Sequence, residues 1–173
     1  MVLALVDDDR GDACFVLTRR SPRLEHHPRQ WALPGGRLEA GEGHVDAALR
    51  ELGEEVGLSV GEADVLGLLD DYPTRSGFVI TPVVVWGGPD VTLRADPVEV
   101  SEIHRVPLAA LEAPEIPRLR SIPESDRPVI SLGLLGTHIH APTAALIYQL
   151  REVAVHGRST RVAHFEQPVF AWK

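Results

Sequence analysis

The stretch Gly36–Leu58, GRLEAGEGHVDAALRELGEEVGL, combines an apolar stripe with a cluster of acids. Its apolar residues recur at steps of three and four, which is the spacing of one face of a helix. These residues are Val45, Ala48, Leu49, Leu52 and Val56. The stripe predicts an amphipathic helix that covers a sheet, and Gly57 is well placed to end that helix in the left-handed conformation.

Three acids of the same helix, Glu51, Glu54 and Glu55, also lie three and four positions apart. Their carboxylates should therefore converge on a second face. The C-terminal end of a helix already carries partial negative charge, and like charges at this spacing repel each other. A cation is expected to offset them, and such oxygen ligands suit Mg²⁺ or Mn²⁺. The alternative interpretation is a solvated charged face.

The residues around this cluster support a metal site. Pro34, Gly35 and Gly36 predict a loop tight enough for backbone carbonyls to approach a metal. Arg50 points to a third face of the helix and is placed to anchor Glu42 at the helix start.

The whole stretch also follows a fixed pattern. Gly36, five residues, Glu42, seven residues and then RELGEEVGL from Arg50 to Leu58 match Gx5Ex7REUxEExGU, where U is aliphatic. Over residues 36–58 the chain therefore resembles the Nudix hydrolases. The resemblance implies an α/β Nudix fold, an α/β/α sandwich with a central mixed sheet and a catalytic loop-helix-loop. We expect one Nudix domain over residues 1–173.

The resemblance also implies a chemistry and a set of site residues. The reaction is metal-dependent hydrolysis of a phosphoanhydride bond in a nucleoside diphosphate linked to a further group. The metal, Mg²⁺ or Mn²⁺, is expected on the Gly36 carbonyl and on Glu51, Glu54 and Glu55. Glu51, Glu54, Arg50 and Glu99 are the expected catalytic residues. Either Glu51 or Glu99 takes the proton of the attacking water.

A second informative stretch, TRRSPRLEHHPRQWALPGG (residues 18–36), precedes the acids. Its arginines are Arg19, Arg20, Arg23 and Arg29. Guanidinium groups match phosphate oxygens bidentately, so these residues are candidates for binding substrate phosphates. The alternative is that they pair with surface acids.

This stretch resembles the signature LLTxR(S/A)xxxRxxxGxxxFPGG of Nudix enzymes that cleave coenzyme A. The chain departs from it at Glu25, Arg29 and Leu33, which replace arginine, glycine and phenylalanine. The resemblance, which covers about residues 13–112, implies cleavage of coenzyme A to 3′,5′-ADP and phosphopantetheine. The alternatives are a Nudix enzyme for ADP-ribose, a nucleotide sugar or a modified nucleoside triphosphate, and a non-catalytic nucleotide-binding module.

Composition narrows the class of partner. The net charge of -8 argues against nucleic-acid polymers and anionic membranes. No apolar run approaches the roughly 18 residues that a bilayer requires, so we expect a cytoplasmic protein. A small nucleotide is the expected partner, and a homodimer is left open. The single cysteine, Cys14, lies in the apolar run ACFVL and is interpreted as core. The chain starts directly in a predicted strand, so residues upstream of Met1 are either absent or missing here.

Other expectations concern the rest of the chain. Strands are predicted at residues 2–6 and 13–18, a buried strand with a bulge or edge at Pro82 over residues 78–86, and a helix over residues 143–155. Residues 107–128 hold five prolines and predict a weakly structured excursion, either a lid or an ordered wrap. A final strand pair or edge strand is expected at residues 161–173. His138 and His140 share a strand face, but two histidines fall short of a four-ligand zinc site.

Overall fold

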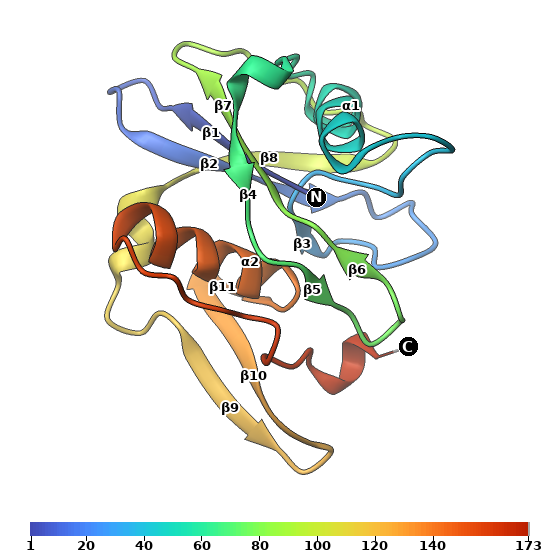
Figure 1. Ribbon diagram of the computed structural model, residues 1–173, viewed down its shortest axis with the longest axis vertical. Helices are drawn as coiled ribbons and strands as arrows, with labels where there is room; N and C mark the ends of the chain where they lie inside the picture. The colour runs from blue at the N-terminus through green and yellow to red at the C-terminus, as the bar shows by residue number, and fades with distance from the viewer. Residues whose placement is uncertain (173) are drawn as a thin grey trace. The chain divides into compact units, whose positions relative to one another are not determined.

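The structure, a computed structural model, describes residues 1–172. The chain divides into two compact units, coloured by residue number in Figure 1. The first consists of Met1–Leu68 and Pro82–Pro107, and the second of Leu69–Thr81 and the chain from Leu108 onward. The expectation of one Nudix domain over residues 1–173 stays a prediction.

The first unit is built on a six-stranded mixed sheet. Its strands are β1 (Val2–Asp7), β2 (Ala13–Arg20), β3 (Trp31–Ala32), β4 (Val65–Leu68), β7 (Val83–Gly88) and β8 (Val100–Pro107). Their order is β3-β2-β1-β7-β4, and β8 also pairs with β2. Strand β1 is parallel to β7, whereas every other pairing in this sheet is antiparallel. The predicted α/β class and mixed central sheet are confirmed.

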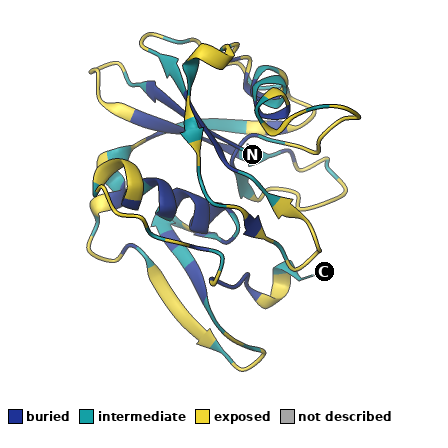
Figure 2. Ribbon diagram, in the orientation of Figure 1, coloured by how far each residue is buried: buried dark blue, intermediate teal, exposed yellow. Residues whose placement is uncertain are grey.

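Helix α1 (His44–Val56) packs against this sheet through the predicted stripe. Ala48, Leu52 and Val56 are buried in one cluster with residues of β1, β2 and β7, and Val45 and Leu49 pack at its margin. The dark buried face of the helix is visible in Figure 2. Gly57 ends the helix with φ 69°, as predicted. Cys14 belongs to the same cluster, which confirms its interpretation as core.

The buried strand predicted over residues 78–86, with a bulge or edge at Pro82, is two separate strands in the structure. Strand β6 (Val79–Ile80) pairs with β5 (Tyr72–Pro73), and β7 begins only at Val83. Pro82 lies between β6 and β7 and has no N–H to donate to a ladder, which explains why the chain changes sheets there. A short 3₁₀ turn, η1 (Glu62–Asp64), precedes β4.

The second unit contains an antiparallel sheet in the order β11-β10-β9 and one helix. The strands are β9 (Arg118–Ile122), β10 (Ser125–Leu134) and β11 (Thr137–His140). Helix α2 (Thr143–Leu150) continues as a π-helical turn (Arg151–Val155). The predicted helix over residues 143–155 is confirmed, and its Leu146, Ile147 and Leu150 are buried. Across residues 1–172 no helix combines the length and apolar character needed to cross a bilayer.

Two expectations for the second unit are corrected. Residues 107–128 are more regular than predicted, because they include a 3₁₀ turn (Leu108–Glu112) and β9. Strand β9 is RLRSI, which lacks the alternation of buried and exposed residues that signals a strand. The expected strand pair at residues 161–173 is wrong for the residues that the structure describes. They form one bridge, Val129–Glu166, and a 3₁₀ turn, Val169–Ala171. Lys173 lies outside the described residues.

Candidate active site

The loop before α1 lies against the acids of the helix. A Cβ on Gly36 would collide with Oε1 of Glu51, so any side chain at this position would displace that carboxylate. Gly35 has φ 147°, and a Cβ there would lie 2.6 Å from the Cα of Met1. The two glycines therefore keep the backbone of the loop next to the Glu51 carboxylate.

Arg50 forms hydrogen bonds with three carboxylates, those of Glu42, Glu51 and Glu54. Its Nε and Nη2 donate to Oε1 and Oε2 of Glu42 at 2.8 and 3.1 Å. Its Nη1 donates to Glu51 at 2.8 Å and to Glu54 at 3.0 Å. The predicted contact between Arg50 and Glu42 is therefore present. Hydrogen bonds from Arg50 and from the Glu39 amide hold the pKa of Glu42 below its usual range.

Glu55 differs from these acids because its side chain is buried, with 4% of the residue exposed. Within residues 1–172 no arginine or histidine side chain forms an ion pair with it, whereas the N-terminal ammonium of Met1 is within electrostatic range of Glu55 and Glu51. Burial raises the pKa of Glu55 to about 8, and the negative charges of Glu51 and Glu99 add to the effect. The Gly35 amide and the Arg20 guanidinium oppose this increase only in part. Glu55 thus lacks a full counter-charge.

The structure brings Glu99 and Arg20 into the electrostatic range of Glu55. Glu99 immediately precedes β8, and its carbonyl accepts a hydrogen bond of 2.8 Å from the Ser21 amide. Ser21 follows Arg20 at the end of β2, so this bond ties the two segments together. The Nε of Arg20 is buried and has no hydrogen-bond partner among the described residues. Arg20 is therefore available for an anion.

The other predicted arginines are placed differently. Arg19 donates to Glu102 at 2.7 Å, and its guanidinium lies 5.7 Å from the centre of the Trp31 ring. Arg23 and Arg29 are exposed on the loop between β2 and β3. The expectation that all four arginines bind substrate phosphates stays a prediction, and Arg19 already has an acidic partner.

Our sequence analysis missed the network around Glu102. Its carboxylate also contacts Nε2 of His104 at 3.0 Å, and hydrogen bonds from His104 and Arg19 lower its pKa. The His104 ring in turn packs edge-on against Trp31, with ring centres 5.0 Å apart. Residues 102 and 104 share a face of β8 by simple alternation, so a confident strand assignment would have indicated the pair.

The donor set of this region suits a hard dication in kind, because carboxylate and carbonyl oxygens are the ligands that Mg²⁺ and Mn²⁺ prefer. Within residues 1–172, however, no group of three or more acidic, histidine or cysteine side chains is already gathered as a metal site. Glu51 and Glu54 are bonded to Arg50 instead. The predicted ligands, Gly36, Glu51, Glu54 and Glu55, stay a prediction.

A mixed sheet with an acidic helix behind a glycine loop defines the class of fold, and comparison with known proteins identifies the family. The model of the NUDIX domain matches residues 1–129. The chain therefore belongs to the Nudix family.

Related proteins agree with this assignment. The chain is 40% identical over 96 residues to the uncharacterized Nudix hydrolase NudL of Klebsiella pneumoniae. The aligned residues make up 55% of this chain and 50% of the relative. The NudL of Photorhabdus laumondii is 39% identical over the same length, with 55% and 51% covered. The chain thus spans about half the length of the curated relatives that it matches.

Solved structures confirm the Nudix fold. The Nudix hydrolase RenU of M. smegmatis has a TM-score of 0.58 at 18% identity and covers 92% of this chain and 86% of its own. The MutT protein of Methanosarcina mazei has a TM-score of 0.50 at 28% identity, with 64% and 78% covered.

Proposed function

We propose that this chain hydrolyses a phosphoanhydride bond in a nucleoside diphosphate linked to a further group, in a metal-dependent reaction. The observation that carries the proposal is Glu55, a buried carboxylate with a pKa raised to about 8 beside two other acids. A strongly perturbed acid in such a cluster is typical of a functional site, and a bound dication would supply the missing counter-charge.

The residues of the site have distinct roles in this proposal. Glu51, Glu54, Glu55 and the Gly36 carbonyl would hold Mg²⁺ or Mn²⁺, and a bound dication would supply neutralisation of phosphate charge and a more acidic water. Arg50 fixes Glu51 and Glu54 through one guanidinium nitrogen. Glu51 or Glu99 accepts the proton of the water. Arg20, whose Nε has no partner in the described part of the chain, donates to a substrate phosphate.

Coenzyme A is the substrate that we propose, with 3′,5′-ADP and phosphopantetheine as products. Arg29 stands where the coenzyme A signature has glycine, and it adopts φ 61°. A position with positive φ favours glycine, so the conformation of Arg29 is one that the glycine of the signature would adopt readily. This conformation supports the assignment, and Arg23 and Arg29 supply cations on the loop that carries Glu25.

A substrate panel tests the proposal. The purified chain is incubated with coenzyme A, ADP-ribose, NADH, a diadenosine polyphosphate and 8-oxo-dGTP, and products are identified by mass. With Mg²⁺ or Mn²⁺ we expect coenzyme A to be cleaved to 3′,5′-ADP and phosphopantetheine. With EDTA we expect no cleavage. If another compound of the panel is cleaved instead, that compound is the substrate and coenzyme A is not. Intact substrates under saturating metal contradict the hydrolase and favour a nucleotide-binding module.

Other features of the protein follow as proposals from the same reaction. A free nucleotide substrate fits a cytoplasmic protein without nucleic-acid or membrane partners, which agrees with the acidic net charge of -8. A homodimer remains compatible with the chain, and sedimentation of the purified protein measures its state.

A further inference from the structure

The sheet of the second unit has two chemically different faces. Ile130, Leu132 and Ile139 are almost completely buried on one of them. On the other, the register aligns Arg118, Ser131 and His140 across the three strands. Arg120 and His138 follow by alternation on the same face. The pairings among the three strands put no acid on this basic face, although Glu166 bridges to Val129 beside it and the protein as a whole is acidic.

His138 presents a donor on the basic face. Its Nε2 lies 3.4 Å from Nη1 of Arg118. A guanidinium only donates, so Nε2 accepts and the proton of the neutral ring lies on Nδ1. Gly133 is the partner of His138 in the register, and a Cβ at Gly133 would lie 3.9 Å from this Nδ1. The missing side chain therefore leaves space in front of an N–H group.

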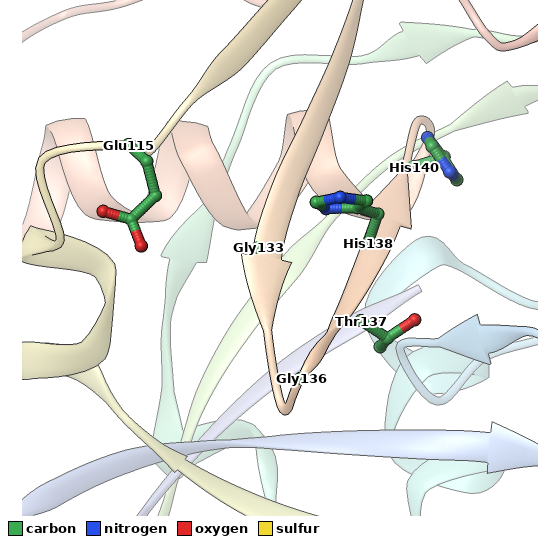
Figure 3. Close-up of a pocket in the computed structure, with 6 residues that line it drawn as sticks. All are labelled: Glu115, Gly133, Gly136, Thr137, His138 and His140. Atoms are coloured by element: carbon green, nitrogen blue, oxygen red, sulfur yellow. The ribbon is translucent and has the colours of Figure 1, made fainter.

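Gly133, His138 and His140 are among the residues that line an open pocket of about 640 Å³. Arg118 adjoins this pocket through its contact with His138. Figure 3 shows His138 and His140 on one side of β10 and Glu115 on the other, with Thr137 and Gly136 at the hairpin. The Nδ1 of His140 is buried and has no hydrogen-bond partner in the described part of the chain. The cavity therefore offers imidazole groups at one end and a carboxylate at the other.

The charges favour an anion over a metal ion at the histidine end. Arg118 lies beside His138. The pKa of His140 is lowered by burial and by the nearby charges of His138 and Arg120. A dication here would be repelled by two guanidinium groups. No group of three or more metal-ligating side chains occurs within residues 1–172.

We propose that this cavity binds a small organic phosphate that carries hydroxyl groups. Its phosphate lies beside Arg118 and His138, where guanidinium and imidazole N–H groups donate to the oxygens. Its hydroxyl-bearing part reaches toward Glu115, which accepts hydrogen bonds. The site does not depend on the proposed hydrolase activity.

A titration of the metal-free full chain with labelled histidines tests the site. The probes are inorganic phosphate, ribose 5-phosphate and ribose, followed by NMR at the imidazole groups. We expect His138 and His140 to shift with both phosphates and not with ribose, and ribose 5-phosphate to bind about tenfold tighter than phosphate. Shifts confined to the remaining histidines, equal shifts with ribose, or no shift at all would overturn the proposal.

Four variants locate the ligand. Arg118→Gln should weaken both phosphates about tenfold. Gly133→Val should block both by filling the space before His138, and valine suits a strand. Glu115→Gln should remove the advantage of ribose 5-phosphate and leave phosphate unchanged. Arg161→Gln, which removes an exposed cation paired with Asp70 at 3.5 Å, is the matched control and should bind like wild type. Unchanged binding by Arg118→Gln contradicts the site.

Discussion

Two buried glutamates, one in each unit, have opposite electrostatic surroundings. Glu55 and Glu152 are equally buried, each 4% exposed. Glu152 lies in the turn after α2 beside the guanidinium groups of Arg151 at 3.5 Å and Arg158 at 3.4 Å and the imidazole of His156 at 3.1 Å. Thr160 also donates to it, at 3.2 Å. Glu55 has no arginine ion pair of this kind in the described structure, lies beside other acids, and is within electrostatic range of the Met1 ammonium and the Arg20 guanidinium.

We propose that the difference separates a structural acid, Glu152, from a functional one, Glu55. Glu152 is neutralised by the protein itself, as buried charges in stable folds generally are. Burial and neighbouring acids raise the pKa of Glu55 to about 8, so its ionised form costs stability unless a further cation compensates it. Four experiments on this pair and its neighbours test the distinction.

The largest effect should come from replacing the two glutamates in turn. Glu55→Gln keeps the size and removes the charge, and we expect turnover to fall roughly 10²- to 10⁴-fold. Glu152→Gln is the matched control and should keep wild-type turnover at temperatures where the protein is folded. Steady-state kinetics under saturating Mg²⁺ measure both. Near-normal turnover of Glu55→Gln would remove this residue from the site.

Stability should show the reverse order. Glu152→Gln leaves Arg151, His156 and Arg158 around a neutral amide, and we expect it to cost about 3 kcal/mol of unfolding free energy. Glu55→Gln should stabilise the metal-free protein at alkaline pH, because it removes an unpaired buried charge. Urea unfolding in EDTA compares the two, and a Glu55→Gln protein destabilised as much as Glu152→Gln contradicts the distinction.

The pH dependence of stability should follow from Glu55. Its pKa is raised from 4.5 to about 8 in the folded protein, so the native state binds more protons than the unfolded state between these values. The unfolding free energy of the metal-free protein should therefore fall by a few kcal/mol as pH rises through this window. Unfolding curves across the window should lose that fall in Glu55→Gln and retain it in Glu54→Gln.

A smaller effect is expected at Arg50. Lysine keeps the charge but cannot donate to Glu42, Glu51 and Glu54 together, as the guanidinium does. We expect Arg50→Lys to lower turnover about tenfold because the carboxylates lose their orientation. Steady-state kinetics, with a circular dichroism spectrum as the folding control, provide the measurement. Wild-type turnover would show that charge alone suffices.

The sequence predicted the first unit well because its signals are local. The apolar stripe of α1, the left-handed Gly57 and the contact of Arg50 with Glu42 all follow from spacing along one helix. The acidic face of the helix could be predicted for the same reason. The burial of Glu55 could not be predicted, because it depends on the loop at Gly35 and on Glu99, which are distant in sequence.

The second unit was predicted less well because its structure depends on contacts between distant segments. Strand β9 is largely exposed on both faces and is defined by its pairing with β10. The C-terminal segment is fixed by Glu166, which bridges to Val129 and binds Arg75 and Ser125. The cations around Glu152 likewise come from positions that periodicity does not group.

The most direct test of the central claim is Mn²⁺ binding without substrate, followed by electron paramagnetic resonance of the free ion. We expect the wild-type protein and Glu152→Gln to bind Mn²⁺ equally, and Glu55→Gln and Glu54→Gln to bind at least about tenfold more weakly. Equal binding by all four proteins would show that the acidic face of α1 does not hold the metal.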